Sequence, residues 1–244
     1  LSIRRQRQMC IRDSPIILDN NKTYLNLKRA LVIIIGVVLI DQCSKFYIKL
    51  NYPLSSYGVP PIIDWGFFKL LFVENKGMAM GTKFNDILPF IEEDSAKLFL
   101  TLFRLIAILG LGYWLLDSIK KNSPILLSCA LALIFAGALG NIIDSVFYGF
   151  IFSDSYNSVA TLFPLEGGYA PLFYGHVVDM LQFPLVEWTW PNWVPVLGGD
   201  TFLFFQYIFN IADTAISTGV GILIVFNKKI FKEEPLKTIE SFEE

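Results

Sequence analysis

Four long apolar segments constrain the fold of this chain more than any other feature. They run over about residues 27–48, 98–116, 125–148 and 201–226. At about 1.5 Å per helical residue, each is about long enough to cross roughly 30 Å of hydrocarbon. Of the 244 residues, 54% are hydrophobic, which is unusual for a soluble domain. The sequence therefore predicts an α-helical membrane protein with four transmembrane helices.

Basic residues beside these segments predict the orientation of the chain in the membrane. By the positive-inside rule, the flanks that carry them are cytoplasmic, so both termini should lie inside. Residues 149–200 contain neither Lys nor Arg and should face outward. The flanking basic residues are Lys22, Lys28, Arg29, Lys120, Lys121, Lys228, Lys229 and Lys232.

The segments between the spans predict a small β-rich platform on the extracytoplasmic side. Residues 62–80 mix β-branched and aromatic residues with Gly breaks, as short strands do. Residues 184–195 supply three tryptophans, which suit the membrane interface. We expect one membrane domain over residues 15–232, with an outer-loop insertion at about 149–176.

The two ends of the chain differ from this domain. Residues 1–14 are polar and aperiodic, and we interpret them as a non-native or disordered leader outside the fold. Residues 233–244 follow the last basic flank and are expected to form a cytoplasmic tail.

Composition excludes several functional classes. A net charge of −2 and the lack of an extended basic patch argue against nucleic-acid binding. The cysteines Cys10, Cys43 and Cys129 have no CxxC spacing, and His176 is the single histidine. We therefore expect no metal and no cofactor, and a Ser-His-Asp triad could run only through His176.

Polar residues in or near the spans come in pairs at helical spacing. Asn210 and Asp213 lie three apart, and a central Asp opposes membrane insertion by roughly 2.5 to 3.5 kcal/mol. An intramembrane acid is thus a functional hypothesis. The alternatives are a polar contact between helices, or a shorter helix with Asp213 at its wet end.

Two further pairs share this pattern, namely Asp41 with Lys45 and Asn141 with Asp144. Each pair should occupy one helix face, and three such faces turned together would form a polar pocket. The alternative is that each pair neutralises itself. That reading suits Asp41 and Lys45 better than the Asn and Asp pairs, since Asn cannot cancel a charge.

Acids gathered in such a pocket can catalyse peptide hydrolysis. When two carboxyl groups share a site, one is pushed to a raised pKa and stays protonated. The ionised member can take a proton from water while the protonated member donates one to a carbonyl oxygen. By itself, Asp179 in an outer loop is more typical of a solvated or capping residue.

Five short motifs make the chain resemble the bacterial lipoprotein signal peptidases, the type II signal peptidases. They are DQCSK (41–45), ENKGMAMG (74–81), GALGNIID (137–144), VVDM (177–180) and FNIAD (209–213). They occur in the family's order and extend over most of the chain from residue 28 to 226.

The resemblance implies an aspartyl endopeptidase of the bacterial inner membrane that removes the signal peptide of a prolipoprotein before its diacylglyceryl-modified cysteine. Asp179 and Asp213 would be the catalytic dyad. Lipid-modified prolipoproteins and membrane lipid would be the partners of a monomeric enzyme with its active site on the extracytoplasmic side. The site-supporting residues would be Asp41, Lys45, Asn75, Gly77, Asn141, Asp144 and Asn210.

Two departures from the family pattern stand out. The family places Arg directly after the aspartate of GNxxD, whereas Ser145 follows Asp144 here, and Arg104 is a candidate substitute. The stretch between Asp144 and Asp179 is also longer than in the family. A proton- or ion-coupled transporter that uses intramembrane acids is the alternative function, and a structural membrane protein comes third.

Overall fold

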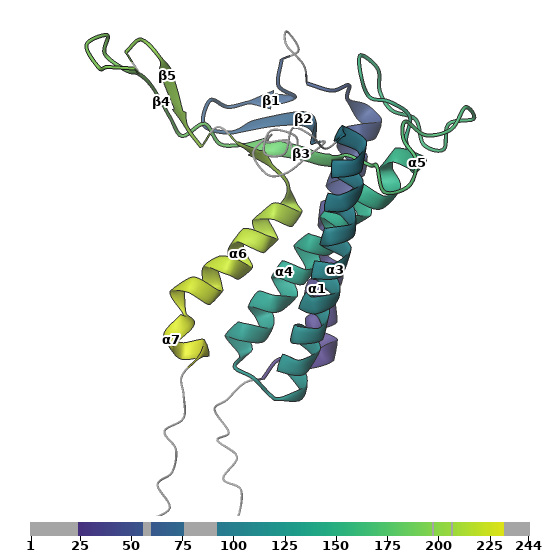
Figure 1. The fold of residues 1–244 in the computed structure, drawn as a ribbon. Helices are drawn as coiled ribbons and strands as arrows, with labels where there is room; N and C mark the ends of the chain where they lie inside the picture. Colours follow the sequence, from purple (N-terminus) through teal and green to yellow (C-terminus); the bar gives the residue numbers. More distant parts are fainter. Residues whose placement is uncertain (1–23, 56–59, 76–91, 197, 206, 232–244) are drawn as a thin grey trace, which may run out of the picture.

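A computed structural model of the chain describes residues 24–55, 60–75, 92–196, 198–205 and 207–231. The expected leader (1–14), the expected tail (233–244) and Gly77 lie outside these residues. The described part forms a helical bundle with a small antiparallel sheet across one end (Figure 1).

Within the residues that the structure describes, three helices are long and apolar enough to cross a membrane. They are α1 (Leu27–Asn51), α3 (Glu93–Lys120) and α4 (Ile125–Ile143), which continues through a π-helical turn, η2 (Asp144–Tyr148), into α5 (Gly149–Ile151). Large apolar side chains on their outer sides are exposed, Leu109 by 74% of its surface for example. Exposure of this kind suits a surface that faces lipid.

The fourth span differs from the sequence-based expectation. Helix α6 covers only Ile211–Val225, and the short helix α7 (Asn227–Ile230) follows it. Its 15 residues measure about 22 Å at 1.5 Å per residue, less than the roughly 30 Å of hydrocarbon. The stretch 201–209, expected to be helical, instead contains two strands. Its aromatic residues and Ile208 suit β structure, and Asn210 then caps the helix.

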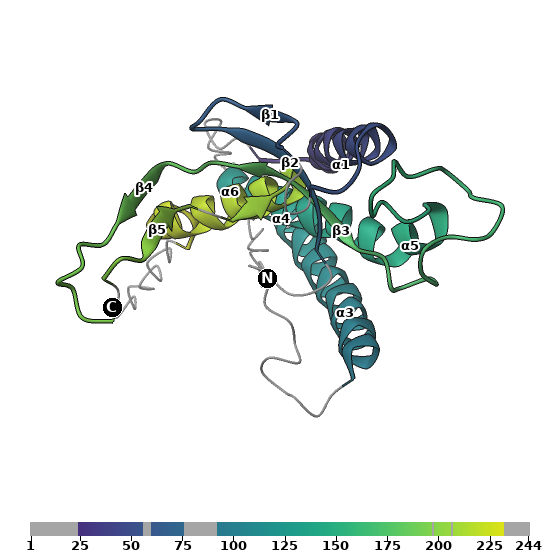
Figure 2. The same ribbon diagram turned by 90° about the horizontal axis from the view of Figure 1, so that it is seen from above.

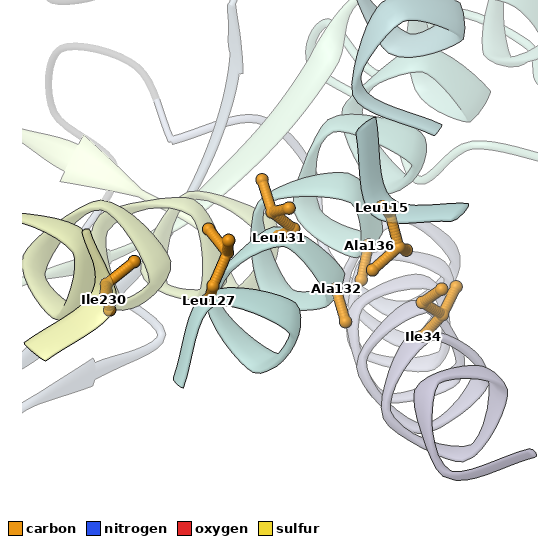
Figure 3. Close-up of a cluster of buried hydrophobic side chains, with 7 residues drawn as sticks. All are labelled: Ile34, Leu115, Leu127, Leu131, Ala132, Ala136 and Ile230. Carbon is orange, nitrogen blue, oxygen red and sulfur yellow. The ribbon is translucent and has the colours of Figure 1, made fainter. Parts of the chain in front are cut away.

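Helix α4 lies at the centre of the bundle and contacts α1, α3 and α6 (Figure 1). Small residues permit this close packing. An added Cβ at Gly137 would lie 2.2 Å from the carbonyl oxygen of Ala212 on α6, which is far inside contact distance. A cluster of buried apolar side chains joins α1, α3, α4 and α7 (Figure 3): Ile34, Leu115, Leu127, Leu131, Ala132, Ala136 and Ile230.

The sheet has four strands in the order β1-β2-β3-β6, all antiparallel. They are β1 (Ile63–Asp64), β2 (Lys69–Asn75), β3 (Val177–Gln182) and β6 (Ile208–Phe209). In the central pair, Val73 lies opposite Asp179 and Asn75 opposite Val177, beyond a β-bulge between Leu70 and Val73. The predicted small β-rich platform is confirmed.

Two structures extend from the sheet in opposite directions when the molecule is seen from above (Figure 2). One is a hairpin of β4 (Val186–Thr189) and β5 (Thr201–Phe204). The other is the segment 149–176, which begins with α5 and folds back on itself through an isolated bridge between Phe152 and Leu162. The latter is the segment that the sequence predicts as an insertion.

The basic flanks lie at the end of the bundle opposite the sheet. An isolated bridge between Tyr24 and Pro124 places the start of α1 beside the turn between α3 and α4. Ile230 of α7 belongs to the same buried cluster as Leu127, near the start of α4. The three basic flanks therefore lie at one end of the bundle, and the sheet lies at the other (Figure 1).

Candidate active site

A buried ion cluster ties α1 to the end of α4. The ammonium of Lys45 lies 2.8 Å from Asp41 Oδ2 and 2.7 Å from Asp144 Oδ2, and all three side chains are fully buried. Buried charges cost free energy unless they are paired and hydrogen-bonded. The self-neutralising interpretation of Asp41 and Lys45 is thus correct as far as it goes, but Lys45 also pairs with Asp144.

Both carboxylates of this cluster also accept hydrogen bonds from backbone amides of other elements. Asp41 Oδ1 accepts a hydrogen bond from the Ala212 amide in α6 at 2.9 Å, and Asp144 Oδ2 accepts one from the Val178 amide in β3 at 3.3 Å. Gly140 leaves room for this arrangement, because a Cβ there would lie 2.6 Å from Asp41 Oδ2. The cluster thereby positions the two elements that carry Asp179 and Asp213.

Gln42 completes the cluster and was not foreseen from the sequence. Its amide nitrogen donates to Asp41 Oδ2 at 3.1 Å and to Asp144 Oδ1 at 3.0 Å, while its oxygen accepts from the Tyr148 hydroxyl at 3.0 Å. The only signal in the sequence is its position next to Asp41, inside DQCSK. Neighbours in a helix point in different directions, so helical spacing gives no hint of this contact.

Asn210 and Asp213 form a capping box at the start of α6. The Asn210 side chain accepts from the Asp213 amide at 2.9 Å, and Asp213 Oδ2 accepts from the Asn210 amide at 3.3 Å. Such a box satisfies two backbone donors at a helix N-terminus. The expectation that these residues share a face within a span is therefore wrong, and Asp213 stands in the first turn of a shorter helix.

Asn141 links the ion cluster to Asp213. Its amide nitrogen donates to Asp213 Oδ1 at 2.8 Å, and its oxygen accepts from Lys45 at 3.1 Å and from the Asn210 amide nitrogen at 3.2 Å. An asparagine both donates and accepts, so it can orient a carboxylate and an ammonium together.

Asp179 lies in β3 and is only 5% exposed. Its Oδ1 accepts from Asn210 at 2.8 Å and its Oδ2 from Asn75 at 3.2 Å. The sequence alone suggested a solvated or capping residue, and that interpretation is wrong. The sheet register buries Asp179 and brings it to the same asparagine that caps Asp213.

The environment of Asp179 favours its protonated form. Burial, followed by the negative charge of Asp213, raises the pKa of Asp179 to about 7, against the lowering effect of hydrogen bonds from Asn75 and Asn210. Near neutral pH Asp179 can therefore hold a proton.

Arg104 of α3 reaches the position where the sequence departs from the family pattern. Its Nη1 donates to Ser145 Oγ at 3.2 Å, and its charge interacts with Asp213 and Asp179. A guanidinium from α3 therefore stands beside Ser145 and within electrostatic reach of both acids.

The structure brings together eight of the nine site residues indicated by the sequence, and the ninth, Gly77, lies outside the described residues. The eight are Asp41, Lys45, Asn75, Asn141, Asp144, Asp179, Asn210 and Asp213. His176 belongs to a neighbouring group, with Nδ1 3.0 Å from Glu74 Oε2 and its ring against Tyr169. The arrangement is that of a paired-carboxylate site at the sheet end of the bundle, suited to general acid and base chemistry.

Comparison with known proteins agrees with this geometry. A family model described as signal peptidase (SPase) II matches residues 33–228. A lipoprotein signal peptidase of Porphyromonas gingivalis is 44% identical over 195 residues, which cover 79% of this chain and 80% of the relative. One from Amoebophilus asiaticus is 34% identical over 207 residues, covering 84% and 80% of the two chains.

Two solved bacterial membrane enzymes share the fold. One has a TM-score of 0.51 at 23% identity and covers 88% of this chain and 97% of its own. The other has a TM-score of 0.52 at 21% identity, covering 87% and 99%. With five motifs in order, two aspartates that share hydrogen bonds with Asn210 and a family model that matches most of its length, the chain belongs to the signal peptidase II family of aspartic peptidases.

Proposed function

We propose that this protein removes the signal peptide from prolipoproteins by cleaving before the diacylglyceryl-modified cysteine, with Asp179 and Asp213 as the catalytic dyad. The observation that carries the assignment is the hydrogen bonding of Asn210 at the start of α6. Its side-chain amide donates to the carboxylate of Asp179, and its backbone amide donates to the carboxylate of Asp213. The family match supports the activity, and it gives no support to a transporter.

The two acids take different parts in the proposed reaction. Asp179, whose pKa is raised to about 7, holds the proton and donates it to the scissile carbonyl oxygen. Asp213 takes a proton from the attacking water. Hydrogen bonds from Asn141 and Asn210 fix the direction of its carboxylate. When the resulting tetrahedral diol collapses, the C–N bond breaks, Asp213 returns its proton to the leaving amine and Asp179 takes one back from a hydroxyl group of the diol.

The position of the site suits a lipid-bearing substrate. The outer sides of the helices are apolar and exposed, so lipid would surround them. The acyl chains of the substrate could stay in that lipid while its peptide bond enters the polar site at the sheet end. We place this protein in the bacterial inner membrane as a monomer that binds no nucleic acid, with both termini cytoplasmic and the site extracytoplasmic.

Cleavage of a diacylglyceryl-modified peptide in detergent tests the proposal. Asp179→Asn and Asp213→Asn keep size and polarity but remove the titrating group, so turnover should fall by about 10² to 10⁴ or more. Asp64→Asn is the matched control, because that carboxylate is 44% exposed and lies in the same sheet. Near-normal turnover by a folded Asp213→Asn variant would overturn the dyad, and absence of cleavage by the wild-type protein would overturn the function.

A further inference from the structure

A second buried charge cluster lies one helical turn beyond the first along α1. Lys49 is fully buried four residues after Lys45. Its ammonium forms an ion pair with Glu74 and donates to Ser155 Oγ at 2.8 Å. It also lies 5.0 to 5.6 Å from the ring centres of Phe72, Phe152 and Tyr169. This lysine is thus enclosed by aromatic rings and paired with an acid, which compensates for its burial.

Glu74 is the centre of this cluster. Oε1 faces Lys49 and accepts from Ser155 Oγ at 3.2 Å, and Oε2 lies 3.0 Å from His176 Nδ1. Burial alone would raise the pKa of Glu74, but the hydrogen bond with His176 and the charge of Lys49 together lower it to about 2. The carboxylate is therefore ionised at neutral pH, and it connects α1, β2, the segment 149–176 and the residue that precedes β3.

The cluster lies next to β2 and β3, the strands that carry Asn75 and Asp179. Glu74 precedes Asn75, which donates to Asp179, and lies opposite Val178 in the register of β2 with β3. His176 immediately precedes β3. The hydrogen bond from Asn75 to Asp179 is 3.2 Å long, at the upper end of the normal range, so a small slip of β2 against β3 would break it.

We propose that Lys49 and Glu74, together with their partners Ser155 and His176, form a positioning site that holds Asn75 against Asp179. Through it, the segment 149–176 supports the chemistry of the dyad without touching the substrate. This inference rests on the proposed function, since it assigns the cluster a part in that reaction. The rival is a cluster that contributes only to folding stability.

The two possibilities differ in their effect on the titration of Asp179. The hydrogen bond from Asn75 lowers the pKa of Asp179, so its loss should raise that pKa. The charged groups that act on Asp179 or lie beside it are Asp213 of α6, Lys45 of α1, Arg104 of α3 and Asp144 at the end of α4. Lys49→Met also removes a charge and leaves Glu74 unpaired near β3, whereas Ser155→Ala changes no charge. A shifted titration in Ser155→Ala therefore reports the position of Asn75.

The experiment compares Lys49→Met, Glu74→Gln, the double variant and Lys49→Arg in the detergent cleavage assay over pH 5.5 to 9. The control is Lys69→Met, which removes an exposed ion pair of the same strand, with Asp64 at 3.1 Å. Lys49→Met should lower kcat by about 10 to 10² and move the alkaline limb of its pH profile upward. KM should change little. The double variant and Lys49→Arg should have a kcat between those of Lys49→Met and the wild type. Lys69→Met should behave as wild type.

A folded Lys49→Met variant with wild-type kcat and an unmoved alkaline limb overturns the proposal. The proposal is also overturned if the loss of activity in the variants parallels their loss of thermal stability while the alkaline limb of the pH profile stays unchanged. Should Lys49→Met fail to fold, Ser155→Ala carries the test, because it removes one donor without leaving a buried charge unpaired. It should lower kcat severalfold and shift the limb, and an unchanged profile rejects the positioning site.

A second readout separates this inference from the proposed function. NMR of protein labelled at the aspartate carboxyl carbons follows the titration of Asp179 without any substrate. Should the wild-type protein fail to cleave the lipidated peptide, the proposed function fails, yet the titration still decides the role of the cluster. A higher Asp179 pKa in Ser155→Ala, which changes no charge, supports the positioning role, and an unchanged titration in that variant overturns it.

Discussion

Two asparagines connect the buried ion cluster to the carboxylate pair. Asn141 accepts from Lys45 and donates to Asp213, while Asn210 donates to Asp179 and accepts from the Asp213 amide. An amide carries no charge, so each can orient a carboxylate without neutralising it. Within the site, pairing with Lys45 is left to Asp41 and Asp144, and Asp179 and Asp213 remain available for proton transfer.

The raised pKa of Asp179 predicts the pH dependence of cleavage. Its protonated fraction falls as pH rises through about 7, so the proposed acid is lost on the alkaline side. We expect kcat/KM to decline above about pH 7, with a slope that approaches about tenfold per pH unit. We use kcat/KM because its pH dependence reports the pKa values of the free enzyme. Steady-state cleavage of the lipidated peptide in detergent measures it. A profile that stays flat to pH 9 would contradict the role of Asp179 as the acid.

Asp144→Asn should separate a supporting acid from the two acids proposed to be catalytic. Lys45 keeps Asp41 as a partner at 2.8 Å, and the new amide can still accept from Val178. We expect turnover within about tenfold of wild type, since both acids of the proposed dyad remain. The free energy of unfolding should drop by about 1 to 3 kcal/mol. Single-turnover cleavage and thermal unfolding of Asp144→Asn beside Asp179→Asn give the comparison.

The opposite ranking in that comparison has a specific meaning. If Asp144→Asn is folded and inactive while Asp179→Asn turns over normally, the dyad must be reassigned to Asp144 and Asp213. Asp179 would then be a buried supporting residue.

At the scale of elements, close packing of α4 and α6 brings the site together. Gly137 and Gly219 allow backbone to approach backbone, since a Cβ on Gly219 would lie 2.7 Å from the carbonyl oxygen of Ala130. Small residues serve this purpose between membrane helices, where lipid removes the usual hydrophobic driving force. The start of α6 can therefore reach Asp41 through the Ala212 amide.

Gly137→Ala should separate these two helices. The added methyl group would lie 2.2 Å from the Ala212 carbonyl oxygen, so backbone must move. We expect a loss of about 1 to 3 kcal/mol in unfolding free energy, together with reduced turnover. Gly221→Ala on α6 is the matched control, because a Cβ there has no atom of the described residues within 4 Å. That variant should be neutral or up to about 1 kcal/mol more stable.

Thermal unfolding in detergent, with the cleavage assay beside it, measures both glycine variants. Equal midpoints for Gly137→Ala and Gly221→Ala would show that close contact between α4 and α6 is not required.

For the whole molecule, the distribution of charge and the position of the sheet agree. The start of α1, the turn between α3 and α4, and α7 lie at one end of the bundle and bear the basic flanks. The sheet, the hairpin and the segment 149–176 lie toward the other end (Figure 1). This separation supports the proposed orientation with the site on the extracytoplasmic side.

Cysteine labelling in intact cells tests that orientation. With the native cysteines replaced, Cys at Lys121 or Lys229 should react only after a membrane-permeant reagent is used. Cys at Ser158 or Asn192 should react with an impermeant one. These four positions are exposed, so labelling is not limited by burial. Impermeant labelling at position 121 with protection at 158 would reverse the topology.

The sequence by itself determined the membrane class and the family, and its motifs indicated the candidate acids. The length and apolarity of a span are local properties, and the five motifs each lie within eight residues. The same local pattern led to the wrong prediction that the last span begins at Thr201. A run of aromatic and apolar residues is compatible with both a helix and a strand. Only strand pairing distinguishes the two, since residues 201–204 pair with β4 and residues 208–209 pair with β3.

The tertiary structure alone decided which polar groups meet. Asp179 receives its hydrogen bonds from residues 104 and 31 positions away, and Lys49 reaches Ser155 across 106 positions. Burial and charge pairing at such separations depend on how strands and helices pack. A sequence pattern that spans a few residues carries no information about them. Packing also set the raised pKa of Asp179, because that pKa arises from burial and from a neighbour, Asp213, that the fold brings near.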